Sequence, residues 1–86
     1  MTGTKTGILV EKEPGLQGIF RGSEHSYVRC VIADPTDPTR QFECRVLDAE
    51  DLPVAIGEPI TLEVLNVVTD RKSGKVRFDC HFIQNA

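Results

Sequence analysis

Two stretches of strict alternation on either side of a proline-containing turn decide the fold of this chain. Residues 27–33 read YVRCVIA, residues 34–39 read DPTDPT, and residues 41–46 read QFECRV. Period-two alternation is typical of half-buried strands, and paired aspartates and prolines favour a turn. One face of the two stretches is apolar, formed by Val28, Cys30, Ile32, Phe42, Cys44 and Val46. The segment is therefore predicted to be a β-hairpin with one apolar and one polar face.

Further strands are predicted on both sides of this hairpin. Residues 7–11 (GILVE) begin a first strand, which residues 16–20 (LQGIF) continue after a bulge or bend, or else form separately. Residues 22–26 are expected to be a polar loop. Residues 60–68 and 75–83 predict two more strands, joined by a hairpin loop over residues 70–74. The apolar sets of these strands are Ile60, Leu62 and Val64, then Val76, Phe78, Cys80 and Phe82.

The segment between the third and fourth strands is expected to hold one helical turn. Residues 47–52 (LDAEDL) place Asp48 as an N-cap, and Pro53 limits the length of the turn. Strands with a single apolar face must curl or find a partner to bury that face, and a closed barrel also removes exposed edges. We therefore expect an all-β, five-stranded OB-like barrel with one short helical turn between strands 3 and 4, forming a single domain over residues 1–86.

Composition excludes several classes of protein. The chain has 86 residues, of which 40% are hydrophobic and 27% charged, as in folded domains rather than disordered ones. It contains no apolar run of the roughly 20 residues that a membrane span needs, and residues 1–7 lack the apolar segment of a secretory signal. Three cysteines without CxxC spacing are expected to be reduced thiols in a cytoplasmic protein. The net charge of −3 argues against binding nucleic acid through bulk charge alone.

Neither a metal site nor a catalytic site is predicted. Cys30, Cys44 and Cys80 all fall on inward faces, where free cysteine packs as a small hydrophobe. Cys80 and His81 are neighbours on one strand and therefore point to opposite faces. The sequence has no GxSxG, GxxxxGK or GxGxxG motif. We expect no enzyme activity, no cofactor and no bound metal.

The second half of the chain resembles the small single-stranded-DNA-binding proteins of filamentous phages. The resemblance covers residues 41–83 and lies in spacing: ECRVLD at residues 43–48, Pro53, Gly57, a strand, a hairpin with Gly74 at its tip and a closing strand. It implies an OB-type fold, a dimer, and binding of single strands through aromatic and basic side chains. Tyr27, which follows a polar loop, is the position that matches the family's tyrosine.

Basic residues are unevenly placed along the chain. Four cations and only one carboxylate, Asp70, lie within residues 70–77. In OB barrels the loops after strands 1 and 4 flank the ligand groove, and strands 2 and 3 form its floor. Such grooves follow a phosphate backbone while bases stack on aromatic rings. The predicted nucleic-acid-binding residues are Arg21, Tyr27, Arg29, Arg45, Arg71, Lys72, Lys75 and Arg77; Phe20 is a further stacking candidate if it is exposed.

Two functions follow from this pattern. The leading hypothesis is a homodimeric module that binds single-stranded nucleic acid, with DNA favoured, weakly and with little sequence preference. The alternative is a protein-interaction adaptor that uses an exposed strand edge or its acidic turn, Asp48, Glu50 and Asp51. Under that alternative the loop cations are solvated charges that block edge-to-edge pairing.

Overall fold

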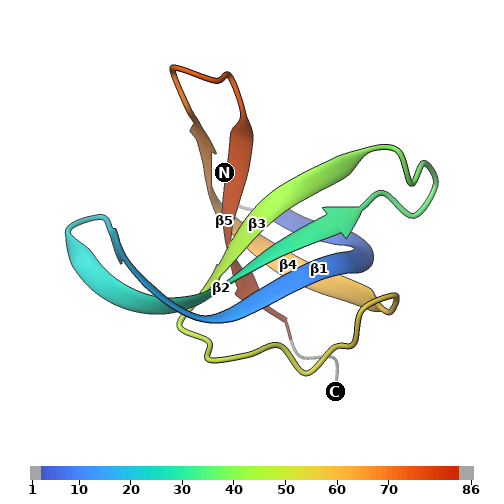
Figure 1. Cartoon of the computed structure of the whole chain (residues 1–86), viewed down its shortest axis with the longest axis horizontal. Coiled ribbons are helices and arrows are strands. Elements are labelled where there is room, and N and C mark those ends of the chain that lie inside the picture. Colours follow the sequence, from blue (N-terminus) through green and yellow to red (C-terminus); the bar gives the residue numbers. More distant parts are fainter. Residues whose placement is uncertain (1–2, 84–86) are drawn as a thin grey trace.

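Five strands form one closed barrel in the computed structural model (Figure 1). The structure describes residues 3–83. The β1–β2 hairpin extends to the left of this view, and the β4–β5 hairpin projects at its top. The strands are β1 (Gly3–Phe20), β2 (Ser23–Ala33), β3 (Gln41–Leu47), β4 (Pro59–Thr69) and β5 (Val76–Phe82).

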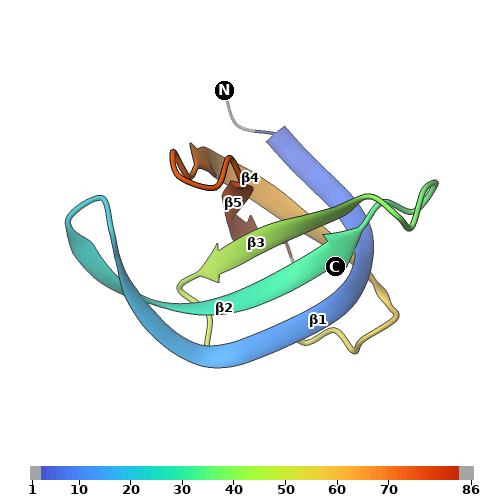
Figure 2. The same cartoon turned by 45° about the horizontal axis from the view of Figure 1, so that its top comes forward.

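The barrel closes in the order β1-β2-β3-β5-β4, with β4 returning to β1. Neighbouring strands are antiparallel except for β3 and β5, which run parallel over residues 43–46 and 77–80. Figure 2 shows how β1 curves around the barrel to reach both neighbours, because its first residues pair with β4 and the rest with β2. The expected all-β, OB-like five-stranded barrel is confirmed.

The first strand is longer than residues 7–11, and it does continue through residues 16–20. Its register against β2 shifts twice, between Leu9 and Glu11 and again between Glu13 and Leu16. Gly15 has a φ of 76°, which glycine adopts without a Cβ penalty. The polar loop expected over residues 22–26 is wrong: the connection is a tight turn at Arg21 and Gly22, both with positive φ, and Ser23 already pairs with Phe20.

The core follows the alternation predicted from the sequence. The buried residues include Leu9, Val28, Ile32, Val46, Ile60 and Leu62, together with the three cysteines. Hydrogen bonds with Cys30 and Cys80, together with burial, raise the pKa of the Cys44 thiol, so this thiol is neutral and unreactive.

Two aspects of the expected core are wrong. Phe42, Phe78, Phe82 and Val64 are only half-buried at its margin, and Val76 is 44% exposed because β4 and β5 extend beyond the barrel there. Asp79, expected outside, is only 6% exposed, since it lies in a hollow beside Arg77. Alternation predicts the side of a strand on which a side chain lies. It does not predict how deeply neighbouring side chains bury that side chain.

The helical turn expected over residues 47–52 does not form, and residues 3–83 contain no helix that could cross a membrane. Asp48 is not an N-cap, because its φ is 58° and its amide donates to the Ser26 carbonyl at 2.8 Å. An irregular linker takes the place of the helix and inserts Leu52 into the core. Lys12 fixes this linker by donating to the carbonyls of Leu52 and Val54 and by pairing with Asp51 at 3.1 Å.

Candidate nucleic-acid interface

The outward side chains of β2, β3 and β5 form one continuous surface, here called the outer face. Strand pairing places Tyr27 opposite Leu47 and Arg29 opposite Arg45, and it places Arg45 beside Asp79. The equivalent surface of OB barrels binds oligonucleotides and oligosaccharides. The sequence-based assignment of Tyr27, Arg29 and Arg45 to a single face is therefore confirmed.

At one end of the outer face, two rings and a guanidinium pack together as an aromatic cluster of Phe20, Tyr27 and Arg45. The Phe20 and Tyr27 rings meet edge to face with centroids 5.4 Å apart. The Arg45 guanidinium lies 5.3 Å from the Tyr27 centroid and 5.8 Å from that of Phe20. Phe20 is buried by these contacts, so it is not the exposed stacking residue considered from the sequence. Tyr27, which is half-buried, is the ring that remains available.

Two features of the aromatic cluster depend on its surroundings. Gly18 lies beneath the rings, since a Cβ there would be 3.1 Å from Tyr27 Cε1 and 3.3 Å from Phe20 Cε2. Arg45 forms no ion pair within residues 3–83, and its buried Nε has no hydrogen-bond partner there. A buried donor without an acceptor is costly, and no carboxylate within residues 3–83 neutralises the charge of this guanidinium.

Next to the aromatic cluster on the outer face, carboxylates surround Arg29; this carboxylate cluster consists of Glu11, Glu13, Arg29 and Glu43. Arg29 Nε donates to Glu43 at 2.9 Å, and its Nη1 lies 3.4 Å from Glu11 and 3.9 Å from Glu13. Burial opposes the charge of Arg29, but the hydrogen bond and charge of Glu43 and then those of Glu11 raise its pKa. Arg29 is thus already neutralised and is a poor phosphate ligand.

A cleft of about 530 Å³ opens between the β1–β2 hairpin and the end of the outer face. We call this space the inter-hairpin cleft. The β1–β2 hairpin contributes Phe20, Arg21 and His25, and β5 contributes Arg77, Asp79 and His81. Arg77 Nε donates to Asp79 at 3.2 Å, so this guanidinium is partly neutralised.

A second hollow, of about 360 Å³, lies at the base of the β4–β5 loop and is called the loop hollow. It is lined by Arg45, Lys75 and Arg77, with Glu43 and Asp70 as its acidic members. Arg77 lines both spaces, so the inter-hairpin cleft and the loop hollow lie on either side of this side chain. The two spaces together are called the path. Phe20 lines the cleft and Arg45 lines the loop hollow, whereas Tyr27 contacts both of these residues and lines neither space.

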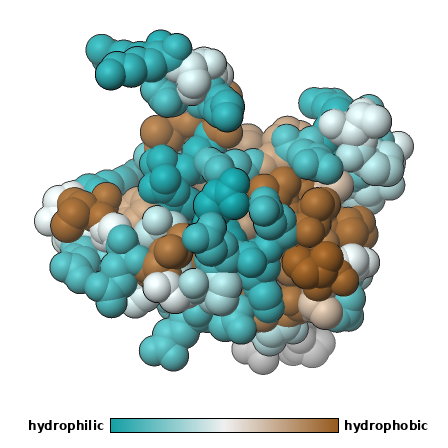
Figure 3. Space-filling model, viewed as in Figure 1, coloured by the Kyte–Doolittle hydropathy of each residue, from teal (hydrophilic) through white to brown (hydrophobic). Residues whose placement is uncertain are grey.

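The tip of the β4–β5 loop lies outside this path. Asp70 orders the loop by accepting hydrogen bonds from the Lys72 amide at 2.9 Å and from the Ser73 hydroxyl at 3.0 Å. Arg71 and Lys72 are exposed, and neither lines the inter-hairpin cleft or the loop hollow. Figure 3 shows hydrophilic residues on this projecting loop and across the middle of the face turned to the viewer. The tip cations therefore lie away from both spaces.

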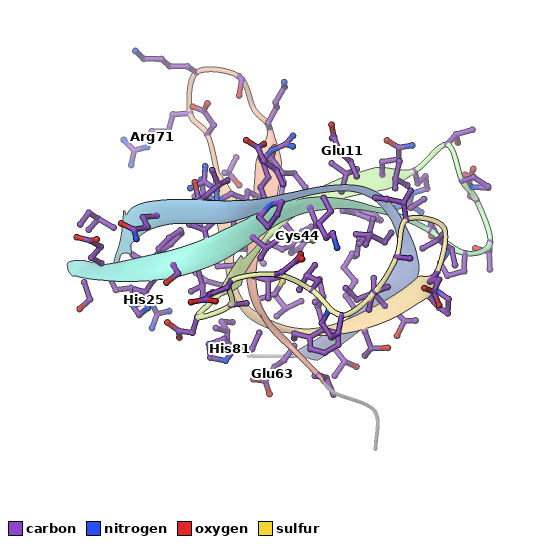
Figure 4. The ribbon with its side chains drawn as sticks, turned by 60° about the horizontal axis from the view of Figure 1, so that its bottom comes forward. Glu11, His25, Cys44, Glu63, Arg71 and His81 are labelled. Atoms are coloured by element: carbon purple, nitrogen blue, oxygen red, sulfur yellow. The ribbon has the colours of Figure 1, made fainter. Side chains whose placement is uncertain are left out.

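One carboxylate joins two histidines across the inter-hairpin cleft, an arrangement that was not predicted from the sequence. Asp48 accepts from His25 Nδ1 at 2.7 Å and lies 3.5 Å from His81 Nε2. Figure 4 shows His25 and His81 near each other at the lower side of the barrel, with Arg71 extending from the loop at the top. The hydrogen bond from His25, together with the weaker contact to His81, lowers the pKa of Asp48. The available signal was strand parity, because His25 is in phase with Tyr27 and His81 with Arg77.

The acidic turn is less available to a partner than the adaptor hypothesis requires. Asp48 is engaged by the two histidines and Asp51 by Lys12, whereas Glu50 has no ion pair in the part of the chain that the structure describes. Among the described residues, no cluster of histidine, cysteine and carboxylate side chains is arranged to hold a metal ion. Comparisons with protein families, curated proteins and solved structures find no match for this chain.

Proposed function

We propose that this barrel binds single-stranded nucleic acid, with DNA favoured, along the path from the inter-hairpin cleft to the loop hollow. The observation that carries the proposal is the packing of Arg45, which lines the loop hollow, on Tyr27 and on Phe20, which lines the inter-hairpin cleft. An aromatic ring accepts any base by stacking, and the adjacent guanidinium binds the phosphate backbone, so sequence preference is low.

The charges along the path predict weak binding. Arg21, Arg45, Lys75 and Arg77 are opposed by Glu43, Asp48, Asp70 and Asp79. With no net formal charge on this path, stacking on Tyr27, worth about 1–3 kcal/mol per base, supplies much of the affinity. Attraction from Arg21, Arg71, Lys72 and Lys75 adds a term that salt screens.

The test is a fluorescence-anisotropy titration with an oligo-dT strand at about 50 and about 200 mM salt. Affinity is expected to fall with salt and to be stronger for the single strand than for a duplex of equal length. Lys75→Ala should reduce the slope of log K against log salt by about 0.7, the value for one phosphate contact. Arg40→Ala, which removes a cation outside both hollows, is the matched control and should leave the slope unchanged. Equal slopes in the two variants would contradict the proposed path.

A homodimer in a reducing compartment such as the cytoplasm completes the proposal. β1 pairs with β4 only through residues 3–8, which leaves that edge of β1 without a strand partner over residues 16–20 in the described structure. Ile19 at this edge is 69% exposed. An open edge invites pairing with a second copy about a two-fold axis. Sedimentation equilibrium of the wild type and of Ile19→Lys tests this, because a lysine at the edge should weaken self-association.

The adaptor hypothesis uses the same edge and is separated by the same experiments. A protein partner that adds a strand to β1 would compete with self-association but not with oligo-dT on the outer face. If oligo-dT does not bind and the protein is monomeric with a free edge, the adaptor becomes the better explanation.

A further inference from the structure

The two histidines of the chain meet at one carboxylate in the inter-hairpin cleft, although they come from different strands. His25 lies on β2, His81 lies on β5, and Asp48 follows β3. The His25 ring is the better held of the two, because its Nδ1 is 2.7 Å from Asp48 and its ring packs edge to face on Phe20 at 6.1 Å. Both side chains line the same cleft as Arg21 and Arg77.

The hydrogen bond to Asp48 determines what the free nitrogen of His25 can do. A carboxylate only accepts hydrogen bonds, so in the neutral ring the single N–H is on Nδ1 and Nε2 carries a lone pair. Within residues 3–83, Nε2 of His25 makes no hydrogen bond. The neutral ring therefore presents an acceptor to the cleft, which repels a phosphate oxygen. Protonation of Nε2 turns that acceptor into a charged donor while the bond to Asp48 is kept.

The charges around the histidines determine how protonation changes the net charge of the cleft. The groups facing them are Arg21 from the β1–β2 turn, Asp48 from the linker, Glu63 from β4, and Arg77 and Asp79 from β5. Within the cleft itself two arginines balance two aspartates. The cleft thus carries no net formal charge while both histidines are neutral, and each added proton gives one positive charge.

His81 is placed differently from His25. Its Nε2 lies 3.5 Å from Asp48 and its Nδ1 lies 4.0 Å from Glu63, so both ring nitrogens face carboxylates. In protonated His81 each N–H therefore faces a carboxylate, and neither N–H is directed at a ligand. His81 is therefore a positioning residue that helps to hold Asp48, and it serves as an internal control for His25.

We propose, resting on the function proposed above, that the inter-hairpin cleft is a proton-coupled phosphate subsite in which protonated His25 donates from Nε2 to an internal phosphodiester of the bound strand. One proton is taken up from solvent for each strand bound at a pH above the ordinary histidine range. No covalent bond is made or broken. Acidification thereby strengthens binding by a protein whose overall charge is negative.

The experiment measures the affinity for 5′-hydroxyl oligo-dT from about pH 8 to about pH 6, a range that spans the ordinary histidine pKa. We expect affinity to rise by up to about tenfold per pH unit on the alkaline side, the limit for one coupled proton. Calorimetry in two buffers of different ionisation enthalpy should give an uptake of up to about one proton per strand, largest at pH values just above the ordinary histidine pKa of about 6.5. His25→Gln should abolish both the pH response and the uptake, whereas His81→Gln should keep most of each.

Each alternative outcome has a distinct meaning. Binding that is unchanged between about pH 8 and about pH 6, or an uptake that survives in His25→Gln, overturns the proton-coupled subsite and leaves the proposed function intact. A response confined to 5′-phosphorylated oligo-dT overturns the assignment to an internal phosphodiester. Absence of binding at every pH overturns the proposed function and this subsite together. Far-ultraviolet circular dichroism of both variants verifies that the barrel is folded.

Discussion

Two neighbouring arginines of the outer face are in opposite states. Arg29 and Arg45 are directly opposed in the β2–β3 ladder and lie on the same face. Arg29 is held by carboxylates, with Glu43 at 2.9 Å, whereas Arg45 lies against the Tyr27 and Phe20 rings and has no ion pair within residues 3–83. A basic residue on a binding face is therefore informative only once its neighbours are known.

The difference between the surroundings of Arg29 and those of Arg45 arises from the course of β1. At the carboxylate cluster, β1 places Glu13 opposite Arg29 and Glu11 opposite Val31, two residues further along β2. At the aromatic cluster, β1 has passed its second bulge and brings Leu16 and Gly18 opposite Tyr27 and His25. The bend of one strand thus changes the neighbours of the outer face from acidic to apolar within a few residues.

The largest effect on binding is expected from Tyr27→Ala. The variant removes the half-buried ring on which a base would stack and leaves the cations in place. Oligo-dT affinity should fall by about 1–3 kcal/mol while the salt slope stays the same. Anisotropy titrations at two salt concentrations measure both quantities. A change in slope without a loss of affinity would show that Tyr27 acts on charge placement and not by stacking.

The comparison of the two arginines is tested by Arg45→Gln against the double variant Arg29→Gln/Glu43→Gln. The first removes a cation that a phosphate would satisfy, so affinity should fall several-fold and the slope should decrease by about 0.7. The second removes one charge of each sign from the carboxylate cluster and should leave affinity within about twofold. Equal losses of affinity in the two variants would contradict the distinction between a free Arg45 and a neutralised Arg29.

A smaller effect is expected when the rings of the aromatic cluster are displaced without being removed. Gly18→Ala places a Cβ 3.1 Å from Tyr27 and should shift that ring by a few tenths of an ångström. We expect a loss of affinity of a few-fold and a loss of stability of about 1 kcal/mol. Gly3→Ala is the matched control on the same strand, because a Cβ there meets no atom within 4 Å. Urea denaturation and oligo-dT titration of both variants give the comparison.

The smallest effect concerns acid stability. The pKa of Asp48 is lower in the fold, first through its hydrogen bond from His25, so the charged carboxylate stabilises the barrel above the ordinary aspartate pKa of about 3.9. That stability is lost as the pH falls through the lowered folded value. Asp48→Asn should cost less than about 1 kcal/mol at neutral pH, because Asp48 is mostly exposed. Urea denaturation from neutral pH downward should show the difference shrinking below about pH 4.

Alternation was sufficient to predict the barrel and the side of each strand that faces inward. It placed Cys30, Cys44 and Cys80 inside, and it placed Tyr27, Arg29 and Arg45 on one face, because the direction of a side chain in a strand is a local property. The helical turn was wrong because Asp48 adopts a positive φ and its carboxylate bonds to β2 and β5 rather than to the next turn of chain. That choice depends on partners more than twenty residues away.

The candidate site was predicted less completely than the fold. Arg21, Arg45, Lys75 and Arg77 do lie along one path, but Arg71 and Lys72 lie beyond it and Arg29 is neutralised. Spacing along the chain identifies cations; the carboxylates that pair with them come from other strands in a register that the sequence does not specify. The histidine pair was missed for the same reason.

The most direct test of the account is a backbone amide NMR titration of the protein with oligo-dT. We expect the largest shift changes at Phe20, Tyr27, His25, Arg45 and Arg77, around the aromatic cluster and the inter-hairpin cleft. Glu11 and Glu13 should change little, because they lie outside the path and hold Arg29, which is not a free cation. Shift changes centred on the carboxylate cluster, or on the free edge of β1 with none on the outer face, would contradict the account.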